Sequence, residues 1–239
     1  MIGLGTIINT ASIIGAGIVG HFAGNLFNSE QQESVGRACG ISVLFIAIAG
    51  TMEGMLKLDS GSITAVNTML VVLCIVLGTI IGEALGIEHW FISFGEWLKR
   101  KTGSEGDRNF VNAFVTASLT VSIGAMAIVG SIEDGITRDY TTLALKSVLD
   151  FVIIVVMTSS LGKGCAFSAI PILAFEGSIT LLARLIAPVM TDAAIASLSL
   201  IGSILIFCVG VNLVWDTKLR VANMLPAVVL AVIAGLLPF

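Results

Sequence analysis

The sequence predicts an all-α integral membrane protein: a bundle of about eight transmembrane helices, or seven if one apolar segment is re-entrant. Of its 239 residues, 56% are hydrophobic and only 12% are charged, whereas about a quarter of the residues in a soluble domain carry charge. The mean hydropathy is +1.03. Apolar runs of roughly 18 residues or more recur, and each can cross a hydrocarbon core of roughly 30 Å as a helix. We therefore expect residues 1–239 to form a single polytopic transmembrane domain.

The first predicted helix covers residues 4–24 and contains the sequence GAGIVG. Its glycines match the pattern of a dinucleotide-binding loop, but such a loop needs a preceding strand and a following helix in a soluble unit. Here the apolar run continues past the glycines. Small residues four positions apart, such as Gly20 and Gly24, instead allow helices to approach closely in lipid. We interpret the motif as a helix-packing surface.

Two more helices are predicted over residues 35–55 and 63–86. The segment that follows, EHWFISFGEWLKRK, begins at residue 88 and places Trp and Phe side chains on one helical face, with Lys and Arg at its end. This pattern is typical of a helix that lies in the lipid headgroup layer.

The remaining helices are predicted over residues 109–130, from about Asp139 to the next Ser/Gly-rich segment, and over 166–187, 193–215 and 221–237, with Pro226 inside the last. The helix that begins near Asp139 carries polar residues at multiples of four: Thr142, Lys146, Asp150 and Thr158. The helix over 166–187 carries a second series in the same register: Ser168, Glu176, Thr180 and Arg184. Residues four apart share a helix face. The two polar stripes are therefore predicted to face each other.

The segment between these two helices, TSSLGKGCAFSAIP, is rich in Ser and Gly and contains Pro171. Two interpretations are open: a short cytoplasmic turn, and a re-entrant or broken-helix site. Non-helical backbone at membrane depth occurs where it is buried in protein or lines a water-filled cavity. Broken helices also form the binding sites of many transporters.

Ionisable side chains inside a span are candidates for a functional site, because charge is costly in hydrocarbon. We expect Asp150 and Glu176 to coordinate a cation or to carry a proton. Lys146 lies one turn before Asp150 and either belongs to this pathway or forms a self-neutralising structural pair with Asp150. The other predicted pathway residues are polar and neutral: Asn9, Asn67, Ser160, Thr180 and Asn223.

The four cysteines lie in or beside apolar segments, at positions 39, 74, 165 and 208, and are expected to be buried thiols. No metal site and no cofactor are predicted. A Ser/Lys dyad formed by Ser159 or Ser160 with Lys163 lacks a positioned base and oxyanion donors. We therefore expect no enzymatic activity.

The distribution of Lys and Arg predicts the orientation of the chain. The first, third, fifth and seventh predicted loops contain eight of these residues: Arg37, Lys99, Arg100, Lys101, Arg108, Lys163, Lys218 and Arg220. The opposite loops contain Lys57 and Arg138. Loops rich in Lys and Arg remain in the cytoplasm. Both termini are therefore predicted to lie outside.

Short segments of the chain resemble one another, such as IAIAGTMEG at residues 46–54 and AIVGSIEDG at residues 127–135. The possible repeats are residues 63–161 and 166–238, with residues 1–56 as a partial copy. Units with an odd number of helices insert in opposite orientations. Such inverted repeats are a recurrent design of transporters, in which the substrate site lies between the units.

Several blocks of the sequence carry a resemblance to a known family: GTIINTASIIGAGIVG, KSVLDF, SSLGKGCAFSAIP with EGSITLLA, and VANMLP. Across nearly its whole length, the chain resembles the bacterial YqgA/YdfK-type membrane proteins, a family known chiefly as a domain of unknown function. The resemblance implies a multi-pass helical protein of the bacterial cytoplasmic membrane. It supplies no reaction and no substrate.

The sequence thus predicts a membrane transporter or channel for a small solute or ion, with a polar pathway between the fifth and sixth predicted helices. The alternative is a non-transporting scaffold or sensor that acts through contacts with partner helices. The expected partners are the lipid bilayer, the transported species and further copies of the chain in a homo-oligomer, and nucleic acid is not among them.

Overall fold

The computed structural model describes residues 1–24, 28–59, 61–123 and 125–236. The α-helices are α1 (Leu4–Gly24), α2 (Ser29–Met55), α3 (Thr68–Leu85), α4 (Ile87–Lys101), α5 (Phe110–Ser122), α6 (Ala125–Ile136), α7 (Thr141–Leu161), α8 (Ala169–Ile186), α9 (Asp192–Trp215) and α10 (Pro226–Leu236). Short 3-10 helices precede α8, follow it and precede α10: η1 (Lys163–Ser168), η2 (Ala187–Val189) and η3 (Val221–Met224). The strands β1 (Leu56–Asp59) and β2 (Ser62–Ala65) form an antiparallel hairpin.

Within the described residues, six helices are long and apolar enough to cross a membrane: α1, α2, α3, α7, α8 together with η1, and α9. The bent pair α5 and α6 gives a seventh if it forms one span. A shorter apolar helical segment covers Val221–Gly235. The predicted class, an all-α multi-pass membrane protein, is confirmed, whereas the predicted number of eight spans stays a prediction.

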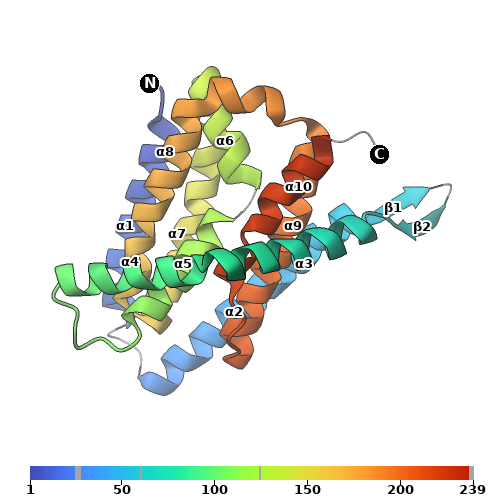
Figure 1. The fold of residues 1–239 in the computed structure, drawn as a ribbon. Helices are drawn as coiled ribbons and strands as arrows, with labels where there is room; N and C mark the ends of the chain where they lie inside the picture. Colours follow the sequence, from blue (N-terminus) through green and yellow to red (C-terminus); the bar gives the residue numbers. More distant parts are fainter. Residues whose placement is uncertain (25–27, 60, 124, 237–239) are drawn as a thin grey trace.

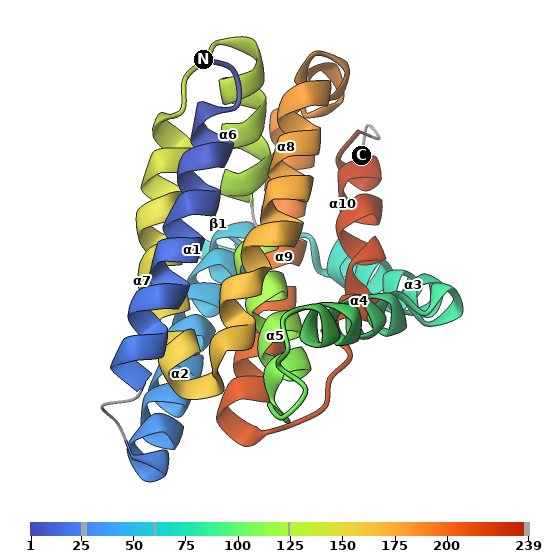
Figure 2. The same ribbon diagram turned by 90° about the vertical axis from the view of Figure 1, so that its left-hand side faces the viewer.

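The long helices pack in pairs. α1 runs along α7, α2 runs along α9, and α8 packs against both α1 and α6 (Figures 1 and 2). α3 and α4 cross this bundle at a large angle, and α3 contacts α10 and η3. The start of α1 and the end of α10 lie toward one end of the bundle, and the connections from α7 to η1 and from α9 to η3 lie at the other (Figure 1).

Glycines permit the close approach of these pairs, as the sequence predicts. A Cβ atom added at Gly20 of α1 would lie 2.6 Å from the Val155 carbonyl oxygen of α7. In the second pair, a Cβ atom at Gly210 of α9 would lie 2.9 Å from the Leu44 side chain of α2. The GAGIVG motif is therefore part of a helix-packing surface. The four cysteines are free, and only Cys208 is not fully buried.

Two predicted helix boundaries are wrong. α2 begins at Ser29, before the predicted residue 35, because Asn28 and Gln31 form a capping box that satisfies free N–H groups at its start. The third helix begins at Thr68 rather than at residue 63, because residues 62–65 pair with β1. Ile63 and Thr64 are β-branched and therefore favour a strand. Gly61 supplies the positive φ of 86° that the turn requires.

The prediction of one helix over residues 109–130 is also wrong. α5 ends at Ser122, and the axis of α6 is bent by 62° from it. Ile123 has extended backbone, with φ −85° and ψ 119°. The last predicted helix is divided as well, because Pro226 stands at the first position of α10, after η3, rather than inside a helix.

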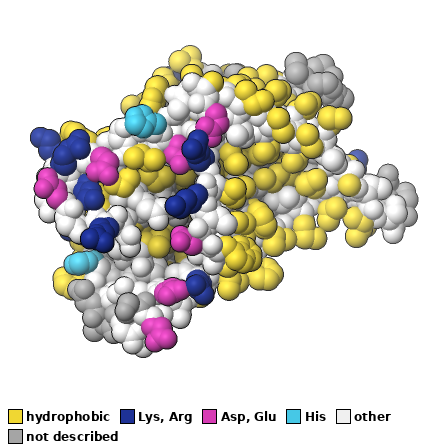
Figure 3. Space-filling view, turned by 60° about the horizontal axis from the view of Figure 1, so that its bottom comes forward, with side chains coloured by type: hydrophobic (Ala, Val, Ile, Leu, Met, Phe, Trp, Pro, Cys, Tyr) yellow, Lys and Arg dark blue, Asp and Glu magenta, His cyan; other side chains and the backbone are white. Residues whose placement is uncertain are grey.

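The predicted amphipathic helix at residues 88–101 is present as α4. Leu98 is buried against α5, whereas Trp90 and Trp97 are exposed. The basic residues Lys99, Arg100 and Lys101 form its last turn. Figure 3 brings the lower end of Figure 1 forward and shows charged side chains gathered on one part of this face, with hydrophobic side chains over much of the rest.

Candidate functional site

Four polar residues from three helices meet inside the bundle. Lys146 and Asp150 lie one turn apart on α7 and form a direct ion pair. Glu176 of α8 brings its Oε1 atom 3.7 Å from the Lys146 Nζ atom. Asn9 of α1 donates from Nδ2 to the same Oε1 atom at 2.8 Å. All four residues are buried, with Asn9 and Glu176 at 0% exposure. We call Asn9, Lys146, Asp150 and Glu176 the polar cluster.

The break between α5 and α6 contributes a backbone atom to the polar cluster. The last carbonyl groups of a helix have no donor within the helix. The Lys146 ammonium group supplies one here, because Nζ donates to the Val121 carbonyl oxygen at 2.8 Å. The lysine thus stabilises an interrupted helix inside the bundle while it pairs with two carboxylates. Because one ammonium group contacts both, a change in the charge of the cluster acts on the backbone at the break.

Further polar contacts extend from the cluster toward the end of the bundle that holds the N-terminus. Thr6 lies one turn before Asn9, and its hydroxyl is 3.3 Å from the hydroxyl of Thr180, one turn after Glu176. Beyond them, the buried carboxylate of Asp134 on α6 accepts hydrogen bonds from the Gly3 and Gly5 amides at 3.2 and 2.9 Å. A carboxylate at the N-terminus of a helix is favoured by the helix dipole.

Several buried polar atoms of the bundle have no hydrogen-bond partner, and two of them belong to the polar cluster. Within the described residues they are Asn9 Oδ1, Ser118 Oγ, Ser131 Oγ, Thr158 Oγ1 and Glu176 Oε2. They belong to α1, α5, α6, α7 and α8, the helices that surround the cluster. Nearly all buried polar groups in proteins are paired, so each unpaired one calls for an explanation. The two unpaired atoms inside the cluster, Asn9 Oδ1 and Glu176 Oε2, indicate a place suited to a polar or ionic species.

The structure brings together five of the eight predicted pathway residues: the four residues of the polar cluster, with Thr180 beside them. The other three lie elsewhere. Ser160 is in the last turn of α7 and donates to the Val156 carbonyl at 3.0 Å. Asn67 is exposed before α3 and donates to the Gly54 carbonyl at 2.9 Å. Asn223 in η3 accepts from the Glu88 amide at 2.7 Å. Arg184, which the polar stripe includes, is exposed.

Sequence reasoning missed three contributors to this region: Thr6, Asp134 and the Val121 carbonyl. Asp134 stands in the segment AIVGSIEDG, whose acidic end near a span is a usable signal. Thr6 lies three positions before Asn9 and shares its helix face. The Val121 carbonyl has no sequence signal, because any residue carries one. α1 also packs against both α7 and α8, and the two polar stripes meet at Lys146 and Glu176 beside this third helix.

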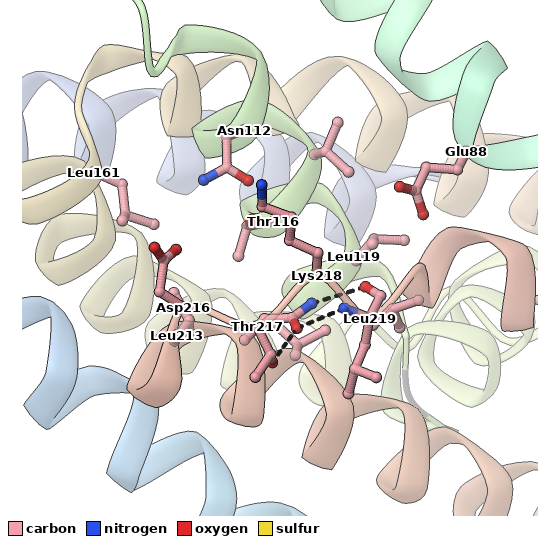
Figure 4. A pocket seen from close by; sticks show the side chains of 14 residues that line it. Glu88, Asn112, Thr116, Leu119, Leu161, Leu213, Asp216, Thr217, Lys218 and Leu219 are labelled. Carbon is pink, nitrogen blue, oxygen red and sulfur yellow. Dashed lines mark hydrogen bonds between the residues drawn. The ribbon is translucent and has the colours of Figure 1, made fainter.

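A polar pocket of about 370 Å³ opens beside α5 at the end of the bundle where α9 ends (Figure 4). Its wall follows α5 from Asn112 past Thr116 to Leu119. Leu119 also lines a second, apolar pocket of about 520 Å³, which reaches Ser122 and Ile123 at the break. Leu119 therefore lines both the polar opening and the apolar space beside the interrupted helix.

The rim of the polar pocket is held by Asn212 of α9. Its Nδ2 atom donates to the Leu219 carbonyl at 2.9 Å, and its Oδ1 atom accepts from Thr217 Oγ1 at 2.7 Å and from the Leu219 amide at 3.0 Å (Figure 4). Glu88, Asp216 and Lys218 supply charge to the wall. Burial raises the pKa of the Glu88 carboxyl, and the charge of Arg220 opposes this shift.

The family described as "Protein of unknown function (DUF554)" matches residues 4–236 of the chain. The chain belongs to the DUF554 family. The DUF554 match includes every residue of the polar cluster, and the predicted resemblance to YqgA/YdfK-type membrane proteins is confirmed.

Two curated relatives align with this DUF554 chain over nearly its whole length. The "Uncharacterized membrane protein YdfK" of Bacillus subtilis (strain 168) is 26% identical over 226 residues, which cover 95% of this chain and 93% of the relative. The "Uncharacterized protein YqgA" of Escherichia coli (strain K12) is 24% identical over 232 residues, which cover 95% of this chain and 94% of the relative. No solved structure matches the chain.

Proposed function

We propose that this DUF554 protein is a transporter or channel that carries a small solute or ion past the polar cluster. The observation that carries the proposal is the burial of Lys146, Asp150 and Glu176 among membrane-spanning helices. An ionisable group at the centre of a helix in a bilayer costs at least about 2.5–3.5 kcal/mol. Three such groups at one place favour a function that requires them.

The composition of the cluster argues against a purely structural ion pair. Lys146 and Asp150 neutralise each other and would suffice as a packed pair. Glu176 adds a second carboxylate near the same ammonium group. With all three groups ionised, the cluster carries a net charge of about −1, which is costly to keep in a dry interior. A site that exchanges a positive species explains the extra carboxylate.

The broken helix and the pockets support a route to this site. Interrupted helices in membrane proteins occur where the freed backbone is buried in protein or lines a cavity, and transporters place binding sites beside such breaks. The polar pocket follows α5 toward the break and ends at Leu119. A shift of Leu119 would connect this opening with the interrupted segment. We propose that the species enters or leaves here.

We further propose that the polar pocket faces the cytoplasm of a bacterial cell and that both termini lie outside. The support is the position of the basic residues. Lys163, Lys218 and Arg220 follow the ends of α7 and α9, at the end of the bundle away from the termini (Figure 1). Segments rich in Lys and Arg remain in the cytoplasm.

The test is a flux measurement with purified protein in liposomes, using a panel of inorganic ions and small metabolites. We expect one species to cross, and Asp150→Asn to lower its initial rate strongly. Asp139→Asn is the matched control, because Asp139 is exposed just before the same helix and its role as a hydrogen-bond acceptor survives in Asn. No flux of any species through the folded protein, or equal rates in the two variants, would contradict the proposal.

The second candidate is a non-transporting scaffold or sensor. It is favoured by α4, which exposes Trp90 and Trp97 at 69% and 46% and carries three basic residues in its last turn. Such a face suits contact with a partner helix or the lipid headgroups. Recovery of a partner in fixed stoichiometry by crosslinking from Trp90, together with no flux, would favour this function over transport.

A further inference from the structure

We infer that Glu176 binds one exchangeable proton, which it shares with Asn9 as a carboxylic acid–amide pair, and that this proton is carried or coupled in transport. The first half of the inference concerns the polar cluster alone. The second half rests on the proposed function.

Charge balance around Glu176 provides the first argument. α7 directs Lys146 and Asp150 toward it, and α6 contributes Asp134 farther along. The neutral groups are Asn9 and Thr6 of α1 and the Val121 carbonyl of α5. Lys146 is bonded directly to Asp150, whereas its distance to Glu176 Oε1 is 3.7 Å. Asp134 is engaged by two backbone amides. The uncompensated negative charge therefore resides on Glu176.

The unpaired atoms of the cluster provide the second argument. Asn9 Nδ2 already donates to Glu176 Oε1 at 2.8 Å. The same two side chains hold two unpaired atoms, Asn9 Oδ1 and Glu176 Oε2, and both residues are fully buried. Both of these atoms are acceptors when the carboxyl group is ionised. A proton on Oε2 turns that atom into a donor to Oδ1, so one proton satisfies both.

A proton fits the site better than a metal cation. Ca²⁺ takes roughly six to eight oxygen ligands, and Mg²⁺ demands near-octahedral coordination by oxygen. Here the Lys146 ammonium group already lies 3.7 Å from Oε1 and donates to the Val121 carbonyl. Its charge repels a second cation at short range. A proton adds no volume and brings the net charge of the cluster to zero.

The exchange is a simple proton transfer. Hydronium gives its proton to Glu176 Oε2 and leaves as water, and the reverse transfer restores the carboxylate. No other bond forms or breaks. When Glu176 is neutral, Lys146 is attracted to Asp150 alone. When Glu176 is ionised, the ammonium group is attracted by both carboxylates. Because the same ammonium group donates to Val121, the protonation state of Glu176 acts on the break between α5 and α6.

Infrared difference spectroscopy of the purified protein tests the site without a flux measurement. We expect a carbonyl stretch of a protonated carboxyl group that shifts in deuterium oxide, disappears as the pH is raised and is absent in Glu176→Gln. Gln preserves both hydrogen bonds, since its amide accepts from Asn9 Nδ2 and donates to Asn9 Oδ1, so this variant is expected to fold. The matched control is Glu133→Gln, a part-buried acid on α6 bonded to Thr142, which should retain the band.

Two results would overturn the proton site: no such band at any pH at which the protein remains folded, or a band that persists in Glu176→Gln. Loss of the band when sodium replaces choline as the cation of the buffer salt, at constant pH, would assign the site to a metal cation. This result would also overturn the proton site. The coupling is tested separately. In liposomes, a pH gradient should drive flux of the transported species through the wild type and not through Glu176→Gln. Equal rates of gradient-driven flux in the two proteins would overturn the coupling. A folded protein that shows the band but moves no species contradicts the proposed function and leaves the proton site standing.

Discussion

The α1/α7 pair and the α2/α9 pair are built in the same way and differ in what they bury. Gly20 brings α1 against the backbone of α7, and Gly210 brings α9 against Leu44 of α2. Every buried residue of α9 is apolar or Gly, and the same holds for the described residues of α2. The α1/α7 pair instead buries Asn9, Lys146 and Asp150. Close helix packing thus needs no charge, and the charges of α7 need another explanation.

The largest expected effect is that of Lys146→Met. It leaves two buried carboxylates without their ammonium partner, and removal of one member of a buried ion pair typically costs about 3–5 kcal/mol. We expect a loss of this size in the free energy of unfolding, measured by denaturant titration in mixed micelles. Adding Asp150→Asn should restore part of it, because the uncompensated charge is removed.

The control for this variant lies in the other pair. Ser203→Ala in α9 removes a hydroxyl that bonds only its own helix, at the Ser199 carbonyl. It should change the free energy of unfolding by no more than about 0.5 kcal/mol. If Lys146→Met were as mild as Ser203→Ala, the cluster would not be ionised in the folded protein, and the contrast between the two pairs would vanish.

The next largest effect concerns the glycine contacts that the α1/α7 and α2/α9 pairs share. Gly20→Ala places a methyl group against the Val155 backbone, which cannot move aside as a side chain can, and overpacking typically costs about 1–3 kcal/mol. Gly15→Ala on the same helix is the control, because its Cβ atom would meet only Phe151, at 3.9 Å. Thermal unfolding should separate the two variants. Equal melting temperatures would show that the α1/α7 contact yields more readily than the structure indicates.

A third prediction concerns a buried polar residue outside the α1/α7 pair. Asn223→Ala removes the acceptor of the Glu88 amide. Glu88 is partly exposed, so water can replace the lost bond, and we expect a loss of about 1 kcal/mol in the free energy of unfolding. Asn223→Asp is the comparison variant, because it retains the acceptor for the Glu88 amide and loses only the donor to the Glu83 carboxylate. A loss as large as that of Lys146→Met would mean that neutral and charged buried groups matter equally here.

The smallest expected effect is a pH dependence at Glu88. Burial raises the pKa of its carboxyl above the value in the unfolded chain, so the folded protein binds this proton more tightly. The contribution to stability is then most favourable at low pH and declines as the pH rises through the folded pKa. Glu88→Gln should therefore have a higher melting temperature than the wild type at neutral pH, with the difference narrowing in acid. A difference that grows in acid would contradict this sign.

The sequence predicted the class, the limits of α1 and most of the polar cluster. The spacing of four residues was sufficient to predict the contact between Lys146 and Asp150, because helical geometry alone brings such side chains together. It also placed Glu176 on the polar face of its own helix. The approach of α1 to this face could not be predicted, since it depends on packing between helices distant in sequence. Asn9 was selected only as a polar residue in a span.

The break after Ser122 was the main failure of prediction. Its sequence contains no proline, and glycine is common in membrane helices. The interruption is stabilised by the Lys146 ammonium group, which comes from another helix. Asn67 and Asn223 were also predicted as pathway residues, and the structure places both outside the polar cluster. An isolated Asn in an apolar sequence can be a ligand or a residue that holds a turn. In the structure, Asn67 bonds the Gly54 carbonyl, and Asn223 bonds the Glu88 amide and the Glu83 side chain.

The shortness of α5 and α6 has a consequence for how the protein is made. They contain 13 and 12 residues, which correspond to rises of about 20 and 18 Å, less than a hydrocarbon core of roughly 30 Å. Neither half can cross the bilayer alone as the ribosome delivers it. The open backbone at the bend gains its donor only after α7 has been synthesised. We therefore expect the two half-helices to reach their final positions only together with α7, whose Lys146 supplies that donor.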